Sequence, residues 1–428
     1  MSEVAFKDRP YDLFISYSHK DHALVEPVAR WLLDVANVRV WWDERSLGAG
    51  DTIETELPIG LSSSRGVLFA VSRQSAAAGW VQGEFGLAIK QRTVYKEFRI
   101  ICLSLDGSEP PPLAATTKWI ATQGGRFDEA IACQLLAGLY GAVGSVVHGT
   151  RDVYVSRSWR PSEAALADSV CQRFIKAGYR LVGDSEDHRH YDEATRIRML
   201  IRSCSALLAI APNRTGSGHT SKYIESEILT AIESGIPTMV VCEAGVTLAD
   251  AIMKQLPIEW IFRGDANPPD TQNTFESVLE TLAEEFSPPP RPHYAFYATS
   301  LRTDRSLIRN ARQLIEQITG IECMLGTDLG GKGAQLKIVE MIRGALFVVA
   351  DVSDGNLNTL IEAGIALGSG TPLYLLAQGE PRPTRFMFRD FEVNFYNNGL
   401  ELFGALHREA RKYRRRILNR EMSSTGWF

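Results

Sequence analysis

The sequence predicts an α/β protein with three doubly wound parallel-sheet units, and two observations favour this fold class. Apolar runs of strand length alternate with amphipathic stretches along the chain, and the runs are nearly continuous, as in strands buried on both faces of a parallel sheet. The 428 residues exceed one ordinary core, and contents of 45% hydrophobic and 23% charged residues are typical of a globular chain. We therefore expect several folded domains.

The first unit contains four apolar runs that we expect to form strands. They are residues 12–17, 38–42, 66–72 and 99–105. Stretches with helical periodicity separate them, such as ALVEPVARWLLDVA between the first two runs. This order of strand and helix predicts a parallel sheet with helices on both faces.

The same alternation recurs twice. The second unit has runs at residues 152–158, 179–184, 206–212 and 237–243, and the third has runs at residues 294–300, 321–326, 345–353 and 372–378. A short polar segment that contains glycine separates the first and second units. A Pro-rich segment separates the second and third units, because proline cannot continue a helix or a central strand. We predict domains at residues 1–145, 150–288 and 292–428.

The second and third units also share a spacing. Glu227 precedes Pro237 by ten residues, and Glu362 precedes Pro372 by ten residues, each in a helical stretch that leads into an apolar run. The shared spacing and strand order favour a tandem pair of Rossmann-like units over coincidence.

Charge and hydropathy argue against several functional classes. The net charge of −5 provides no general basic field for DNA, so a bound nucleotide would be held by local Arg and Lys side chains. No apolar run approaches the roughly 20 residues that span a bilayer, and the first ten residues lack the order of a signal peptide. We expect a cytoplasmic protein without a membrane contact.

The cysteine and histidine positions predict neither disulfides nor a metal site. The six cysteines are scattered without a CxxC pair, so we expect buried, reduced thiols at Cys102, Cys133, Cys171, Cys204, Cys242 and Cys323. His188 and His190 have no cysteine or carboxylate at ligand spacing, and we expect a solvated loop there.

Three ordered motifs in the first unit resemble the Toll/interleukin-1 receptor (TIR) domain family. FISYS ends the first expected strand, Asp43-x-x-x-Leu47-x-x-Gly50 follows the second, and Ser75-x(4)-Trp80-x-x-x-Glu84 lies on an expected helix. The resemblance covers about 140 residues and implies a flavodoxin-like domain. Bacterial TIR domains of this kind commonly cleave the N-glycosidic bond of NAD+, whereas others only assemble with partner TIR domains.

Glu84 is the expected catalytic residue. Loss of nicotinamide leaves an oxocarbenium-like ribose, which a nearby carboxylate stabilises. The pyridinium leaves as a neutral molecule, so a general acid is not required and one carboxylate suffices. NAD+ would be the substrate, and we expect no separate cofactor. A solvated helix face is the alternative interpretation of Glu84.

The same resemblance implies four NAD+-binding residues. Trp80, one helical turn before Glu84, would offer its ring to the nicotinamide or ribose, although it would also fit as packing against the sheet. Ser16 ends the first strand, at the edge where open α/β sheets bind ligands. Asp43 and Arg45 begin the loop after the second strand and would contact ribose or phosphate, with a loop cap as the alternative for Asp43.

The tandem units behind a TIR domain resemble the SAVED domain, a fusion of two CARF-like folds found in bacterial anti-phage CBASS effectors. The resemblance rests on the order and length of the units. It implies a cyclic di- or trinucleotide ligand that induces assembly into an oligomer or filament and so activates the TIR domain. Strand-end residues suited to this ligand are Arg157, Ser158, Trp159, Arg214, Lys222, Ser300, Arg302, Lys332, Asp351, Ser353 and Asn356.

Two other functions remain open. The chain would also fit a non-enzymatic TIR adaptor that recruits a partner. Residues 351–372 resemble nucleoside deoxyribosyltransferases, in which Glu362 would be a nucleophile. The basic stretch at 406–422 predicts a helix with a solvated basic face, or one that contacts an acidic surface of another protomer or the ligand's phosphates.

Overall fold

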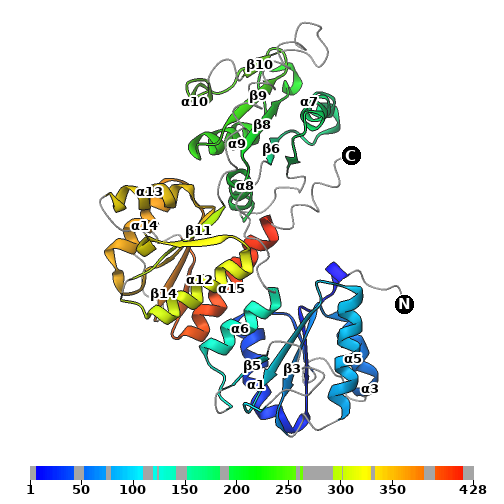
Figure 1. Cartoon of the computed structure of the whole chain (residues 1–428). Helices are drawn as coiled ribbons and strands as arrows, with labels where there is room; N and C mark the ends of the chain where they lie inside the picture. Colours follow the sequence, from blue (N-terminus) through cyan, green and yellow to red (C-terminus); the bar gives the residue numbers. More distant parts are fainter. Residues whose placement is uncertain are drawn as a thin grey trace. The chain divides into compact units, whose positions relative to one another are not determined.

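The computed structural model contains three five-stranded sheets (Figure 1). The structure describes residues 6–42, 53–73, 79–108, 119–122, 125–140, 152–183, 192–256, 261–263, 293–300, 302–328, 333–379 and 391–417. Every sheet is assembled in the same strand order, which confirms the predicted fold class of three parallel-sheet α/β units.

The first sheet has the order β2-β1-β3-β4-β5, and its neighbouring strands pair in parallel. Its strands are β1 (Leu13–Tyr17), β2 (Val40–Trp41), β3 (Gly66–Val71), β4 (Arg99–Ser104) and β5 (Trp119–Ala121). The helices are α1 (His22–Arg30), which a π-helix, η3 (Trp31–Val35), continues, α3 (Ile53–Ser63), α5 (Gly79–Val94) and α6 (Glu129–Tyr140). Helices α3 and α5 lie on one face of the sheet, and α1 and α6 lie on the other (Figure 1).

The core of this sheet explains why α5 sits beside β3. Phe85 of α5 packs against Phe69 of β3 with ring centroids 5.3 Å apart, and both are buried. Phe14 of β1 and Trp41 of β2 extend the same cluster, with ring centroids 5.0 Å apart. Burial of these large side chains fixes the helix register, and hence the place of Glu84.

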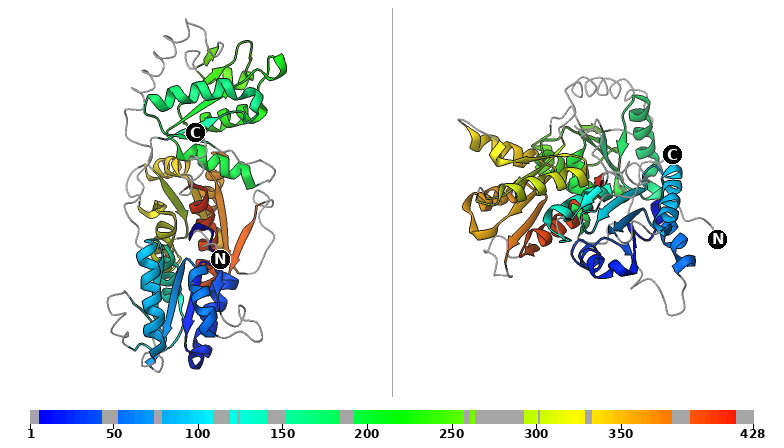
Figure 2. Two further views of the ribbon diagram at one scale, coloured as in Figure 1. Left: turned by 90° about the vertical axis from the view of Figure 1, so that its right-hand side faces the viewer. Right: turned by 60° about the horizontal axis from the view of Figure 1, so that its bottom comes forward.

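The second sheet has the order β10-β9-β8-β6-β7, again with parallel neighbours. Its strands are β6 (Val153–Ser156), β7 (Leu181–Val182), β8 (Ala206–Ala211), β9 (Thr238–Cys242) and β10 (Ile261–Arg263). The helices are α7 (Ala164–Lys176), α8 (Asp192–Ser203), α9 (Lys222–Glu233) and α10 (Asp250–Met253). Helices α7 and α9 both contact the strands (Figures 1 and 2).

The third sheet has the order β12-β11-β13-β14-β15. Its strands are β11 (Tyr294–Ala298), β12 (Glu322–Leu325), β13 (Phe347–Asp351), β14 (Leu373–Gln378) and β15 (Val393–Tyr396). The helices along this part of the chain are α12 (Arg305–Thr319), α13 (Ala334–Gly344), α14 (Leu357–Gly368) and α15 (Gly399–Ile417). Helix α15 includes residues 406–417 of the basic stretch that was expected to be helical, and residues 418–422 lie outside the described part of the chain.

In all three sheets, the direction in which successive strands are added changes at the same place. Along each sheet, the second strand of the unit is followed by the first, third, fourth and fifth. The switch point therefore lies between the first and third strands, where ligands bind in flavodoxin-like sheets. These are the strand pairs β1 and β3, β6 and β8, and β11 and β13.

By its internal contacts, the chain divides into two compact units, and their boundaries differ from those of the three sheet-containing units described above. One contains Met1–Ser145 together with Arg302–Gly320 and Leu376–Arg411, so α12 and most of α15 belong with the first sheet. The other contains Val146–Leu301, Ile321–Leu375 and Lys412–Phe428. The predicted domain boundaries stay predictions.

Two further sequence expectations can be compared with the fold. All six cysteines are free and buried, as predicted. No helix in the described part of the chain is both long and apolar enough to cross a membrane. His188 and His190 lie outside the described residues.

Candidate functional site

Ser16 and Glu84 meet at the switch point of the first sheet. Ser16 is the fourth residue of β1 and pairs with Phe69 of β3, the strand that precedes α5. Its hydroxyl donates a hydrogen bond to Oε2 of Glu84, although 68 residues separate them in sequence. Ser16 itself is buried. The two residues that the sequence predicted at this edge are thus in direct contact.

Burial changes the acidity of this carboxyl. Because Glu84 is largely removed from solvent, its pKa rises from 4.5 to about 7, although the hydrogen bond from Ser16 favours the charged form and lowers it. The group is therefore close to half ionised at neutral pH. Its carboxylate would stabilise a cation in a site of low dielectric constant more strongly than in water.

A second buried carboxylate lies at the same edge of the sheet and was missed by sequence reasoning. Asp21 precedes α1, and Ser72 directly follows β3. Oδ2 of Asp21 accepts a hydrogen bond from the Ser72 hydroxyl at 2.9 Å. Both residues are buried. In the sequence, the sign of this site was Ser72, which directly follows an apolar run. Its partner Asp21 follows a different strand, β1, so the sequence did not connect the two residues.

An aromatic group adjoins the end of β2. Trp42 is fully buried, and its ring stacks on His22 at 5.9 Å, while Tyr17 lies 6.2 Å from His22. Asp43 and Arg45 come next in sequence but lie outside the described residues. The backbone of Trp80 belongs to α5, but its side chain also lies outside the described part of the chain. Their roles stay predictions.

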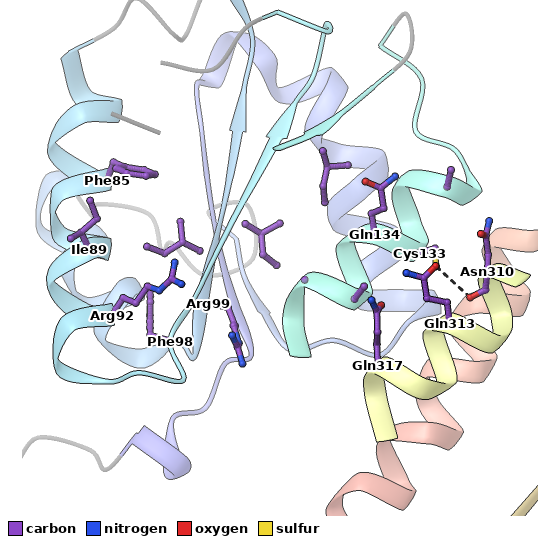
Figure 3. A pocket seen from close by; sticks show the side chains of 16 residues that line it. Phe85, Ile89, Arg92, Phe98, Arg99, Cys133, Gln134, Asn310, Gln313 and Gln317 are labelled. Atoms are coloured by element: carbon purple, nitrogen blue, oxygen red, sulfur yellow. Dashed lines mark hydrogen bonds between the residues drawn. The ribbon is translucent and has the colours of Figure 1, made fainter. Parts of the chain in front are cut away.

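The same compact unit contains a cavity of about 920 Å³, whose lining residues are drawn in Figure 3. Apolar residues such as Phe85 and Ile101 line it, together with Cys133 of α6 and Gln313 of α12. Neither Ser16 nor Glu84 is among the lining residues. The volume of this cavity is therefore no argument for chemistry at Glu84. The raised pKa of the Glu84 carboxyl is the stronger indication of a site.

The second unit has a smaller cavity of about 150 Å³ at its own switch point. It brings together four residues predicted to bind a nucleotide, namely Arg157, Ser158, Trp159 and Arg214. Lys222 opens α9 but is not among the lining residues.

Tyr223 and Glu227 also line this cavity and were not predicted to bind the ligand. The phenol of Tyr154, on β6, donates to Oε1 of Glu227 at 3.2 Å. The side chains of Trp159 and Tyr223 are 41% and 67% exposed, so both offer ring surface to a ligand.

Carboxylates and an aromatic ring orient the arginines of this cavity. Arg157 lies 2.8 Å from Asp168, and its guanidinium carbon is 5.0 Å from the centroid of Trp159. Arg214 lies 3.6 Å from Glu163. Ordered guanidinium groups beside exposed rings suit a ligand that presents both phosphates and bases.

The predicted residues of the third unit make local contacts instead. Asp351 is buried and accepts hydrogen bonds from the backbone and hydroxyl of Ser353. Asn356 caps α14 by accepting from the backbone of Asn358 at 3.1 Å. These bonds explain the Ser, Asp and Asn content of the segment as turn and cap chemistry. Ser300 and Arg302 follow β11, and Lys332 lies outside the described residues.

Among the residues that the structure describes, Glu362 is a second carboxyl whose pKa burial raises to about 7. It belongs to α14, after the third strand of its sheet, as Glu84 belongs to α5. A Cβ atom added to Gly326 would lie 3.2 Å from Oε1 of Glu362, so the missing side chain leaves room for the carboxyl.

The flavodoxin-like strand order of the first sheet agrees with a comparison of the sequence with known families. Residues 13–136 match the TIR domain family, and the chain thus has a TIR domain at its N-terminus, as the motifs predicted. The resemblance of the remaining units to the SAVED domain stays a prediction.

Two curated relatives match the TIR domain alone. NAD(+) hydrolase TcpA of Theionarchaea archaeon (strain DG-70-1) is 32% identical over 82 residues, which are 19% of this chain and 25% of that protein. NAD(+) hydrolase PdTIR of Paracoccus denitrificans (strain Pd 1222) is 37% identical over 76 residues, which are 18% of this chain and 25% of that protein. The chain thus spans about a quarter of the length of these relatives.

A solved structure, the TIR domain of the Toll-related receptor TRR-2 from Hydra magnipapillata, is 14% identical and covers 26% of this chain and 83% of its own. The TM-score of 0.23 is too low to support a conclusion about this protein.

Proposed function

We propose that the TIR domain cleaves the bond between nicotinamide and the ribose of NAD+. The observation that carries this proposal is the hydrogen bond between buried Ser16 and partly buried Glu84 at the switch point of the sheet. As the C1′–N bond breaks, its electrons go to the pyridinium nitrogen and neutral nicotinamide leaves. The positive charge that develops on the ribose is stabilised by the Glu84 carboxylate, and water then adds to C1′ and loses a proton.

Two relatives named as NAD(+) hydrolases support the proposal, with 32% and 37% identity over part of the TIR domain. The test is nicotinamide release from NAD+ by the purified chain, measured with and without a panel of cyclic di- and trinucleotides. Glu84→Gln should reduce release by roughly 100-fold, because it removes the charge that opposes the developing cation. Glu26→Gln is a matched control, since Glu26 pairs with Arg30 on the exposed side of α1. Equal activity in wild type and Glu84→Gln would exclude this mechanism.

We further propose that the second and third units form a sensor for a cyclic di- or trinucleotide. The cavity with Arg157, Arg214, Trp159 and Tyr223 supports this assignment, because it combines cations for phosphates with rings for bases. Ligand binding would assemble protomers into an oligomer or filament and activate the TIR domain. The protein would then be a cytoplasmic bacterial effector that depletes NAD+ during phage infection.

Activity and assembly can be followed in the same samples. Nicotinamide release would be measured with a panel of cyclic di- and trinucleotides while light scattering reports particle mass. We expect release and scattering to rise together for one ligand, and both responses to be lost in Arg214→Gln. Full activity in samples that remain monomeric would contradict activation by assembly.

A second candidate function is favoured by the buried carboxyl of Glu362, which has the acidity of Glu84 without a described hydroxyl partner. This function is transfer of a deoxyribosyl group through a covalent intermediate on Glu362. Activity on nucleosides that survives Glu84→Gln and is lost in Glu362→Gln would support it. Absence of both activities under every ligand would favour the TIR adaptor.

A further inference from the structure

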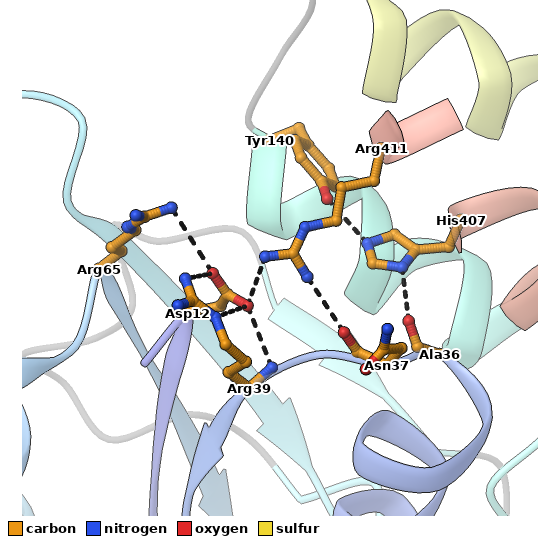
Figure 4. Close-up of polar contacts among 8 residues, drawn as sticks. All are labelled: Asp12, Ala36, Asn37, Arg39, Arg65, Tyr140, His407 and Arg411. Carbon is orange, nitrogen blue, oxygen red and sulfur yellow. Dashed lines mark hydrogen bonds and ion pairs between the residues drawn. The ribbon is translucent and has the colours of Figure 1, made fainter. Parts of the chain in front are cut away.

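The side chains of α15 bind three consecutive carbonyl groups of the TIR domain. Nδ1 of His407 lies 2.7 Å from the carbonyl oxygen of Ala36. Arg411 donates to the carbonyl of Asn37 at 3.1 Å, and Arg408 donates to that of Val35. Val35 is the last residue of η3, and Ala36 and Asn37 follow it. Carbonyl groups at the C-terminal end of a helix have no donor within the helix, so α15 supplies the hydrogen bonds that they would otherwise lack. Figure 4 shows the contacts with Ala36 and Asn37.

The second contact of α15 is with Asp12, which precedes β1. Oδ2 of Asp12 accepts from Arg411 at 2.7 Å and from the backbone N–H of Arg39 at 3.0 Å. Arg39 precedes β2, and Arg65, which precedes β3, lies 3.7 Å from Oδ1 of Asp12. The amino ends of three adjacent strands therefore converge on one carboxylate, and Arg411 ties α15 to all of them (Figure 4).

The contact is buried and closely fitted. His407 is fully buried, and because the carbonyl of Ala36 can only accept, the neutral ring donates from Nδ1 to Ala36. Its Nε2 then accepts from the phenol of Tyr140, 2.8 Å away. The backbone of α15 passes close to Val35 at Gly404. A Cβ atom on Gly404 would lie 2.7 Å from Cγ1 and 2.8 Å from the carbonyl oxygen of Val35, closer than packed atoms allow.

We infer that α15 is a positioning helix of the TIR domain: through Arg411 and its neighbours it holds the starts of β1 and β2, and thereby the Ser16–Glu84 pair at the other end of β1. Ser16 is four residues beyond Asp12 along this strand, and a strand that is fixed at its amino end presents its carboxyl end in one register. The TIR domain is consequently incomplete without α15.

The predicted effect of weakening this anchor is twofold. In Arg411→Gln, the backbone amides of residues 12–13 and 38–39 should exchange with solvent roughly tenfold faster. The reason is that the substitution removes the hydrogen bonds from the Arg411 guanidinium to Asp12 and to the carbonyl of Asn37. The Ser16–Glu84 hydrogen bond should loosen, and since that bond lowers the pKa of Glu84, the carboxyl should titrate at higher pH.

Hydrogen exchange by mass spectrometry measures the first effect in the full chain. The ¹³C resonance of labelled glutamate side chains, with Glu84→Gln to assign the signal, measures the second. Arg411→Lys should be intermediate, because an ammonium group retains the contact with Asp12 but not the planar fork. Gly404→Ala should act like Arg411→Gln, although alanine favours the helix itself. Arg30→Gln, which breaks an exposed ion pair of α1, is the matched control and should change neither readout.

Unchanged exchange in both Arg411→Gln and Gly404→Ala would overturn the inference. Faster exchange with an unchanged Glu84 titration would reduce α15 to a purely structural element and would also overturn it. Neither measurement uses NAD+, so failure of the proposed hydrolase activity would leave both outcomes readable.

Discussion

The substitution Glu84→Gln should change the stability of the first sheet in a pH-dependent way. Burial raises the pKa of Glu84 from 4.5 to about 7, so folding discourages its ionisation. At about 1.4 kcal/mol per pH unit, this difference corresponds to about 3 kcal/mol. The value is an upper bound because Glu84 is only partly buried.

The sign follows from which state binds the proton more tightly. The folded chain keeps Glu84 protonated to higher pH than the unfolded chain, whose value is near 4.5. The stabilising contribution of this proton is therefore complete below about pH 4.5 and is lost as the pH rises to about 7. Glutamine does not titrate. Relative to wild type, the variant should gain up to about 2 kcal/mol in stability between about pH 5 and pH 8.5.

Protection of the β1 and β3 amides from hydrogen exchange is the appropriate assay, because it reports opening of this sheet alone. A melting temperature of the whole chain would mix the titration of Glu84 with that of Glu362, whose pKa is also about 7. Glu362→Gln is the matched control and should leave the exchange of β1 and β3 unchanged. A stability difference between Glu84→Gln and wild type that stays constant with pH would refute the reasoning.

Three further predictions concern single contacts. Ser16→Ala removes the bond that lowers the pKa of Glu84, so the pH midpoint of NAD+ cleavage should rise; an unchanged midpoint in nicotinamide-release profiles would contradict this. Arg157→Gln loses the 2.8 Å pair with Asp168, and calorimetry should show roughly tenfold weaker cyclic nucleotide binding, whereas equal affinity would place the ligand elsewhere. Burial lowers the pKa of His407 from 6.5 to about 4, so its stabilising contribution is present above about pH 6.5 and is lost as the pH falls to about 4. Protection of the amides of residues 35–39, taken relative to the intrinsic exchange rate at each pH, should be lower at pH 5 than at pH 7, and equal protection would disprove this.

Most of the sheet framework was predictable because buried parallel strands are continuous apolar runs. The three strands that sequence reasoning missed are short edge strands, of which β5 (Trp119–Ala121) has an exposed final residue. Three residues with one exposed position carry too weak a pattern for prediction. Ser16 was predictable because it ends a parallel strand at the edge where such sheets bind ligands, and Glu84 was predictable because it lies in a motif that resembles the TIR family.

The docking of α15 was beyond sequence reasoning. The basic stretch predicted a helix, and α15 (Gly399–Ile417) contains the described part of it, but Asp12 is 399 residues from its partner Arg411. Local patterns contain no information at that distance. The expectation of a solvated face or an acid on another protomer also missed that Arg411 binds within its own chain.

The third unit illustrates why polar composition is a weak guide to ligand sites. Asp351, Ser353 and Asn356 were expected to face a nucleotide, yet each makes a hydrogen bond within two residues. Short polar side chains favour such turns and caps whether or not a ligand is present. In the second unit, by contrast, Arg157 and Arg214 are drawn into one cavity by the fold, which composition does not reveal.

A glutamate follows the third strand in every sheet, and its surroundings differ each time. Glu84 accepts from a serine on the first strand, and Glu227 accepts from the longer side chain of Tyr154 on the corresponding strand. Glu362 faces the space left by Gly326. The helix position is thus kept while the facing residue changes, so the hydrogen bonding of each carboxyl depends on a neighbour that sequence spacing does not identify. Substitution of the facing residue, as in Ser16→Ala or Tyr154→Phe, should therefore alter one unit's carboxyl and leave the other two unchanged.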